Sequence, residues 1–158
     1  MSKGRDVLIV EDDPDVRELV AFVLRDAGAR VVAVDSGEAG VRAAASFHPD
    51  LVVTDISMPR MDGIEMVRRL RCHKRTKDIP VVVLTGNTVA DIPGKALGVG
   101  CNDVLAKPCE PDALVRTVNR HIGRRRDDRS TSATTDCGRI DRRAGVPGLF
   151  RERRGPGR

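Results

Sequence analysis

The chain has 158 residues with 28 Lys plus Arg, 23 Asp plus Glu and a net charge of +5, and it contains no Trp or Tyr. This length fits one domain of ordinary size plus an extension, with a core built from aliphatic side chains. No segment approaches the roughly 18 apolar residues of a membrane span, and the apolar run at residues 7–10 is too short for a signal peptide. We therefore expect a cytoplasmic protein.

The charge is divided unevenly along the chain. Residues 1–122 hold 17 basic and 18 acidic residues, which gives −1, whereas residues 123–158 hold 11 and 5, which gives +6. The whole basic excess thus lies in the last 36 residues, which indicates two parts of different character.

The four cysteines are widely separated, and the three histidines do not lie near them in a finger-like pattern. The spacing forms no Cys-x-x-Cys pair and does not favour a zinc site or a disulfide framework. We expect reduced thiols at these positions, which are Cys72, Cys101, Cys109 and Cys137.

The first strand is predicted at residues 7–10 and is followed by a helix. Pro14 suits the first helical position, where its missing N–H is not needed, and Asp13 would be the cap. Gly28 would end this helix. Its apolar stripe, at spacings of three and four, is Val16, Leu19, Val20, Val23 and Leu24.

The second and third strands are predicted at residues 31–34 and 51–54. Ser36 would cap the intervening helix, which ends before Pro49. Asp62, with Glu65 three residues later, resembles a capping box at the start of the next helix. The apolar positions of the two helices are Val41, Ala44 and Ala45, and Met66, Val67 and Leu70.

The fourth strand is predicted at residues 81–84, ending on Thr85. Pro93 and Gly94 predict only a late, short helix near residues 95–99, with a loop over residues 86–92. A fifth strand is predicted at residues 104–106, and Pro111 opens the last helix. Its stripe is Leu114, Val115, Val118 and Ile122.

Apolar strands that alternate with helices predict an α/β domain. Its parallel sheet would be doubly wound, with helices on both faces. In such sheets ligands bind at the carboxyl ends of the strands.

Polar side chains follow four of the predicted strands. They are Glu11, Asp12 and Asp13 after the first strand, Asp55 after the third, Thr85 after the fourth and Lys107 after the fifth. Each alone has an ordinary structural explanation, as a helix start, a strand-end hydroxyl or a solvated lysine. Together they would meet at one edge of the sheet.

Clustered carboxylates repel one another unless a cation lies among them, and Mg²⁺ prefers such oxygen ligands. A carboxylate beside a metal ion, an ammonium and a hydroxyl is equipped to accept a phosphoryl group. The pattern therefore indicates an aspartyl phosphoacceptor at Asp55.

Four motifs and the spacing between two of them carry a resemblance to a known family. The stretches "VLIVEDDP", "LVVTDISMPRMDG", "VVVLTG" and "VLAKP", and the 22 residues from Thr85 to Lys107, resemble the receiver domain of bacterial two-component response regulators. The resemblance covers the chain from about Lys3 to Gly123, so residues 1–123 are expected to form the receiver domain, and it implies a flavodoxin-like, five-stranded parallel sheet of order 2-1-3-4-5. It also implies Mg²⁺ as the cofactor and a phosphorelay switch rather than a metabolic enzyme.

The resemblance also implies roles for individual residues. Asp55 would be the phosphoacceptor and, with Asp12, a direct metal ligand; Glu11 would act on the metal through water. Ser57 would offer its backbone carbonyl to the same ion. Thr85 and Lys107 would bind the phosphoryl oxygens, and Pro108 would follow a cis peptide bond.

Other features would modulate the switch or its readout. The family often has an aromatic residue where this chain has Val104, so the usual ring movement is absent or replaced. Ser57 and Asn87 flank the phosphoryl site and should influence how water approaches it. The Pro93–Gly94 pair disturbs the fourth helix, which in the family commonly contributes to the output surface.

The implied partners are a sensor histidine kinase or a phosphotransfer protein and an unidentified downstream protein, with no membrane partner. Residues 124–158 form an Arg-rich tail that we expect to be disordered. It is too short and too irregular for a helix-turn-helix. It could hold nucleic-acid phosphates non-specifically, although we expect it to be only solvated, or it could be an extension without function.

Two other functions compete with this interpretation. A phosphohydrolase with an aspartyl nucleophile would need a second acid two residues after Asp55, where this chain has Ser57. A flavin-binding domain would need a phosphate-cradling loop after the first strand, where "EDDPD" places negative charge.

Overall fold

The computed structural model describes residues 5–86 and 91–122 of the chain. Its strands are β1 (Arg5–Val10), β2 (Ala29–Val34), β3 (Leu51–Asp55), β4 (Val81–Thr85) and β5 (Asp103–Ala106). The helices that alternate with them are α1 (Pro14–Asp26), α2 (Gly37–Phe47), α3 (Gly63–Arg71), α4 (Asp91–Gly98) and α5 (Pro111–Ile122). Within this described part, no helix is long and apolar enough to cross a bilayer.

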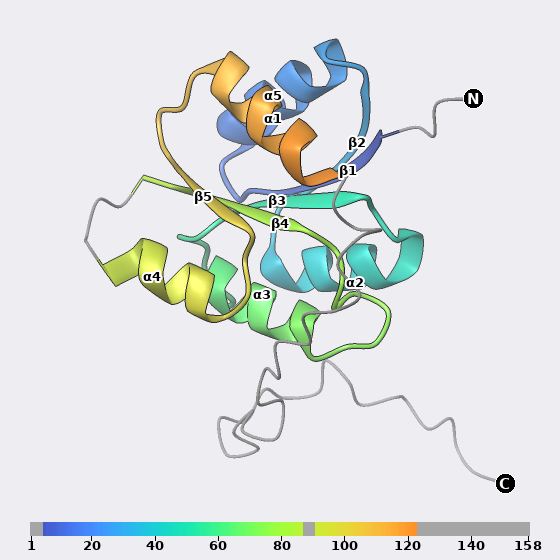
Figure 1. Ribbon diagram of the computed structural model, residues 1–158, viewed down its shortest axis with the longest axis vertical. Coiled ribbons are helices and arrows are strands. Elements are labelled where there is room, and N and C mark those ends of the chain that lie inside the picture. The colour runs from blue at the N-terminus through green and yellow to red at the C-terminus, as the bar shows by residue number, and fades with distance from the viewer. Residues whose placement is uncertain (1–4, 87–90, 123–158) are drawn as a thin grey trace, which may run out of the picture.

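The five strands form one parallel sheet of order β2-β1-β3-β4-β5. Helices α1 and α5 cover one face, and α2, α3 and α4 cover the other (Figure 1). This arrangement confirms the predicted doubly wound, flavodoxin-like fold. β1 and β3 are direct neighbours, and the connections that leave their carboxyl ends run to α1 and α3 on opposite faces of the sheet, which is where such sheets bind ligands.

Alternate residues of the central strands supply two separate cores. Leu8 and Val10 pack under α2 and α3 with Val52, whereas Val7 and Ile9 pack under α1 and α5. Every residue of β3 and β4 is buried, as expected for strands covered on both faces. The central strands are therefore held on both sides, and the residues at their ends have fixed positions.

Side-chain caps begin the first three helices. Asp13 accepts hydrogen bonds from the backbone N–H groups of Asp15 and Val16. Ser36 caps α2 by accepting from Ala39. The caps predicted for α1 and α2 are confirmed, and Pro14 occupies the first position of α1.

The predicted capping box of α3 is only half formed. Asp62 Oδ1 accepts from the Glu65 N–H at 2.8 Å. The Glu65 carboxylate does not complete the box, because it pairs with Arg68 at 2.6 Å and with Arg69 at 3.1 Å. Two guanidinium groups within one helical turn offer this carboxylate stronger partners than one backbone N–H.

The prediction for α4 was wrong at its start. The helix begins at Asp91, so residues 91 and 92, predicted as loop, are helical. Pro93 is the third residue of the helix and lies in the first turn, where backbone N–H groups have no intrahelical acceptor. Proline therefore does not interrupt this helix. The remaining predicted loop residues 87–90, which include Asn87, lie outside the described residues, as do Cys137 and the predicted tail 124–158.

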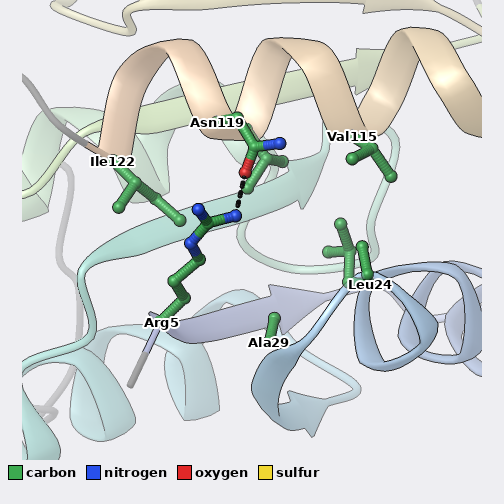
Figure 2. A pocket seen from close by; sticks show the side chains of 8 residues that line it. Arg5, Leu24, Ala29, Val115, Asn119 and Ile122 are labelled. Atoms are coloured by element: carbon green, nitrogen blue, oxygen red, sulfur yellow. Dashed lines mark hydrogen bonds between the residues drawn. The ribbon is translucent and has the colours of Figure 1, made fainter. Parts of the chain in front are cut away.

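Helices α1 and α5 lie side by side. Their interface has two ends, and the one near the amino ends of the strands is closed. Figure 2 shows Arg5 reaching from the start of β1 to α5, where its Nη1 donates to Asn119 Oδ1 at 2.5 Å. The hollow beneath this hydrogen bond, between Leu24 and Ile122, has a volume of only about 10 Å³. It is too small for anything larger than a water molecule.

Candidate functional site

Three carboxylates meet where β1 and β3 end. The register pairs Val10 with Thr54, so the residues that follow, Glu11 and Asp55, lie at the same edge of the sheet. Glu11 is 3% exposed and Asp55 is 6% exposed, whereas Asp12 is open to solvent. One oxygen from each of the three carboxylates lies within 4.8 Å of the others. The structure thus brings together the acids predicted from the strand ends.

Lys107 approaches this acidic cluster from the end of β5. Its Nζ lies 2.7 Å from Glu11 Oε2 and 3.2 Å from Asp55 Oδ1. The peptide bond between Lys107 and Pro108 is cis, as the sequence resemblance implied. One ammonium therefore bridges two buried carboxylates that would otherwise repel each other.

Thr85 is the last residue of β4 and lies between the two elements that carry Asp55 and Lys107. It is 4% exposed, and its carbonyl accepts a hydrogen bond from the Lys107 N–H at 2.7 Å. The register pairs Asp55 with Leu84 and Thr85 with Ala106. Thr85 is thus fixed at the predicted edge of the sheet.

The pKa values at this edge reflect burial and mutual attraction. Burial raises the pKa of Glu11; hydrogen bonds from Lys107 and from the Asp13 N–H oppose this rise, and the Asp55 charge adds to it. Burial alone would lower the pKa of Lys107. Its hydrogen bond to Glu11 and the charge of Asp55 outweigh that effect, so its pKa lies above the ordinary value. Lys107 is therefore fully charged at neutral pH.

Comparison with known proteins identifies the family. The family model named response regulator receiver domain matches residues 7–119, which is more than half of the chain.

The chain belongs to the response regulator receiver domain family.

Individual relatives agree with this assignment. An uncharacterized 14.6 kDa protein of Leptolyngbya boryana is 36% identical over 116 residues, which cover 73% of this chain and 88% of that protein. The DNA-binding response regulator MtrA of Mycolicibacterium smegmatis is 34% identical, and the match spans 77% of this chain but only 52% of MtrA. This receiver domain therefore spans about half the length of some relatives.

A solved structure gives the same fold. The receiver domain of the sensor histidine kinase PA1611 from Pseudomonas aeruginosa, determined with a magnesium ion coordinated in its active site cleft, superposes with a TM-score of 0.72. It is 33% identical, and the match covers 77% of this chain and 99% of that structure.

An arginine that the sequence pattern did not reveal binds the backbone of residues 11–13, which we call the acidic loop. Arg17 of α1 donates from Nη1 to the carbonyl oxygens of Glu11 at 2.8 Å and Asp12 at 3.4 Å. The Asp13 N–H donates to Glu11 Oε1 at 3.2 Å. Arg17 falls outside the apolar stripe of its helix, so periodicity assigned it only to the polar face.

Gly63 holds the chain close behind Asp55. The Gly63 N–H donates to the Ile56 carbonyl at 2.9 Å, and a Cβ added at Gly63 would overlap the backbone carbonyl oxygen of Asp55. Only glycine permits this close approach. The peptide that carries Asp55 is therefore fixed by β-sheet pairing on one side and by the start of α3 on the other.

The other predicted site residues lie as follows. Ser57 is exposed in the loop between β3 and α3, two residues after Asp55. Val104 lies in β5 opposite Val83 and packs against the core beneath α2, α3 and α4. The position that often carries an aromatic ring is therefore filled by a smaller, partly buried side chain.

Proposed function

We propose that this receiver domain accepts a phosphoryl group on Asp55 from a phosphohistidine and thereby switches its conformation. The observation that supports the proposal is the position of the Asp55 carboxylate. It lies within 4.8 Å of oxygens from Glu11 and Asp12 and 3.2 Å from the Lys107 ammonium, at the carboxyl edge of a parallel sheet. Receiver domains act as signalling switches rather than as conventional enzymes.

In the proposed reaction, a carboxylate oxygen of Asp55 attacks the phosphorus atom. A P–O bond forms while the P–N bond to the donor imidazole breaks, and the imidazole keeps the electron pair and takes up a proton. The product is a mixed anhydride on Asp55. The transferred group carries most of its developing charge on its equatorial oxygens, so catalysis depends mainly on cations and hydrogen-bond donors already in place.

Lys107 and Thr85 are the proposed donors to those oxygens. The Lys107 ammonium already contacts Asp55, so a small movement would bring it to a phosphoryl oxygen. Thr85 ends the neighbouring strand and would donate its hydroxyl to another oxygen. Thr85 ends β4, which pairs with β3, and Lys107 follows β5, which pairs with β4. A movement of the two residues would therefore be transmitted to β5 and the helices beside it.

The donor set fits Mg²⁺, because carboxylate oxygens are the ligands that this ion prefers and typically only one or two bind it directly. When bound, Mg²⁺ would neutralise charge on the carboxylates and on the incoming phosphoryl group. Asp12 is exposed and Asp55 lies beside it, and these two would hold the ion with the backbone carbonyl of Ser57. Both oxygens of Glu11 already accept hydrogen bonds from the protein, which suits the expected indirect contact through water.

Phosphorylation would act by favouring one of two conformations that exist beforehand. The proposed donor is a sensor histidine kinase or a phosphotransfer protein in the cytoplasm, and the output is a downstream protein. The proposed receiver unit is residues 1–123, with residues 124–158 as a separate tail. Ser57, Asn87 and Val104 would tune the lifetime and the readout of the phosphorylated state.

Direct phosphorylation of the full chain tests the proposal. The protein is incubated with MgCl₂ and acetyl phosphate, and its intact mass is measured before peptide mapping. We expect a gain of one phosphoryl group on Asp55 that requires Mg²⁺ and disappears in Asp55→Asn. Asp35→Asn is the matched control, because Asp35 is an exposed acid directly after β2 at the same edge of the sheet.

Phosphorylation that persists in Asp55→Asn would overturn the proposal. Sustained release of phosphate from simple phosphate esters would favour the competing phosphohydrolase function instead.

A further inference from the structure

The interface between α1 and α5 is open near the carboxyl ends of the strands, in contrast to its closed opposite end (Figure 2). The hollow there, which we call the α1–α5 hollow, has a volume of about 300 Å³. Its lining is mostly apolar and comprises Val16, Leu19, Val20, Val23, Leu84, Lys107, Pro108, Cys109, Pro111 and Leu114.

Bulky apolar side chains are exposed on α1, the helix that lines one side of this hollow. In the described part of the chain, the exposed large hydrophobic residues are Leu19, Phe22, Val32 and Leu97. Leu19 and Phe22 are 61% and 66% exposed and lie three residues apart on α1, so they share one side of the helix. An exposed apolar group next to an apolar hollow marks a surface that something covers.

Exposed acidic residues lie on the two elements that form the α1–α5 hollow, namely α1 and the start of α5. Asp15 and Glu18 are exposed and directly precede two lining residues of α1, and Glu110 and Asp112 are exposed on either side of Pro111. An occupant that is apolar in its centre and basic next to it would therefore match this surface in both packing and charge.

The chain itself contains a segment of this composition. Beyond α5, residues 123–158 carry a net charge of +6, and the only adjacent pair of bulky apolar residues among them is Leu149 and Phe150. Arginines follow at once, as Arg151, Arg153 and Arg154.

The tether is long enough to bring this segment back. α5 has 12 residues and is about 18 Å long, and the hollow lies beside its first turns. The 23 residues between 122 and 146 can span up to about 75 Å, so the connection does not restrict docking.

We propose that residues 146–154 dock in the α1–α5 hollow of the same chain. Leu149 and Phe150 fill the hollow beside Leu19, and the arginines that follow lie near the exposed acidic residues of α1 and of the start of α5. Covalent attachment compensates for the small contact area, because it keeps the segment at a high effective concentration near its site.

Docking in the α1–α5 hollow would affect the acidic cluster of Glu11, Asp12 and Asp55 through Lys107, which the two sites share. Lys107 is one of the residues that line the hollow, and its ammonium contacts Glu11 and Asp55. A docked segment would therefore restrict the movement of this lysine and oppose the phosphorylated conformation. This consequence rests on the proposed function, whereas the docking itself is tested without phosphorylation.

Cys109 provides a probe, because it lines the α1–α5 hollow and is partly accessible. The full chain is treated with N-ethylmaleimide, and modification of each cysteine is followed by peptide mapping. Cys72, at the end of α3 on the other face of the sheet, is the internal reference. Burial raises the pKa of the Cys109 thiol, so all variants are compared at one pH.

The decisive comparison is between the wild type and a Leu149→Ser, Phe150→Ser double variant. A hollow occupied three quarters of the time would give about fourfold faster modification of Cys109 in the double variant, with no change at Cys72. Replacing the three arginines by glutamine should also accelerate modification. Ile140→Ser, which removes an apolar side chain elsewhere in the same tail, is the matched control and should behave as wild type.

Equal Cys109 rates in the wild type and in the double variant would overturn the proposal. It would also be overturned if protection of Cys109 increased with protein concentration, because that result would assign the hollow to a second copy of the chain.

Discussion

Replacing Lys107 by methionine should destabilise the metal-free protein, and Mg²⁺ should restore most of the loss. The ammonium bridges Glu11 at 2.7 Å and Asp55 at 3.2 Å, and these side chains are only 4% and 8% exposed. Methionine keeps the apolar part of the side chain but leaves two buried carboxylates without their cation.

The size of the effect follows from burial. Removing one partner from a fully buried ion pair costs about 3–5 kcal/mol. The Lys107 side chain is 23% exposed, so solvent screens part of the interaction, and we expect a loss of about 2 kcal/mol in the free energy of unfolding. Bound Mg²⁺ would replace the missing positive charge, so the loss should shrink when millimolar MgCl₂ is present.

Urea unfolding at neutral pH, with and without MgCl₂, measures this loss. Arg30→Met is the matched control, because Arg30 also lies 2.7 Å from its partner Asp6, but its side chain is 72% exposed. We expect that variant to lose less than about 0.5 kcal/mol, independently of Mg²⁺. Equal losses in the two variants would refute the argument that burial determines the strength of the Lys107 pair.

The pH dependence has a definite sign. The folded state raises the pKa of Lys107 above 10.5, so folding favours its charged form. Its contribution to stability is complete at neutral pH and is lost as the pH rises through the folded-state pKa. The difference between wild type and Lys107→Met should therefore be constant near neutrality and shrink in strong alkali.

Three further changes test the structure around the site. In urea unfolding, Gly63→Ala should lower the free energy of unfolding by about 3 kcal/mol or more, because its Cβ would overlap the Asp55 carbonyl oxygen. Gly98→Ala is the control and should be neutral or stabilising, because the added Cβ meets nothing within 4 Å. Burial raises the pKa of Cys101 from 9.0 to about 11, so its contribution to stability is present below pH 9 and should fall by about 2 kcal/mol as the pH rises to 11; a flat difference between wild type and Cys101→Ala over this range would contradict the burial argument. Asp13→Ala removes the cap of α1 and should lower stability by about 1 kcal/mol in thermal unfolding, and an unchanged melting temperature would show that the cap is redundant.

The strand-end residues of the site could be predicted because the sheet itself determines where they meet. Asp55 and Lys107 are 52 positions apart, yet Asp55 ends β3 and Lys107 directly follows β5, and the carboxyl ends of parallel strands share one edge. Apolar periodicity was therefore enough to place them together. The resemblance to receiver domains added the roles of these residues and the strand order.

Other contacts could not be predicted because they depend on long side chains that leave their own element. Arg17 turns back to the carbonyls of the acidic loop, and Arg71 reaches the carbonyls of Ile79 and Gly100. Many acceptors compete for a guanidinium, and periodicity does not select among them. The early start of α4 was missed for a different reason: Pro93 was interpreted as a helix breaker, although the first turn of a helix accepts proline.

The close approach of Gly63 to the Asp55 backbone defines how the loop between β3 and α3 can be re-engineered. A saturation library over this loop should retain glycine at position 63, because each of the other nineteen residues adds an atom where the Asp55 carbonyl already lies. Ser57 and Pro59 are exposed and should tolerate wide variation. Arg60, with φ of 68°, should drift toward glycine or asparagine. The loop thus offers freely variable positions next to an unchangeable one, so that the surroundings of the acceptor aspartate can diversify while its backbone remains in place.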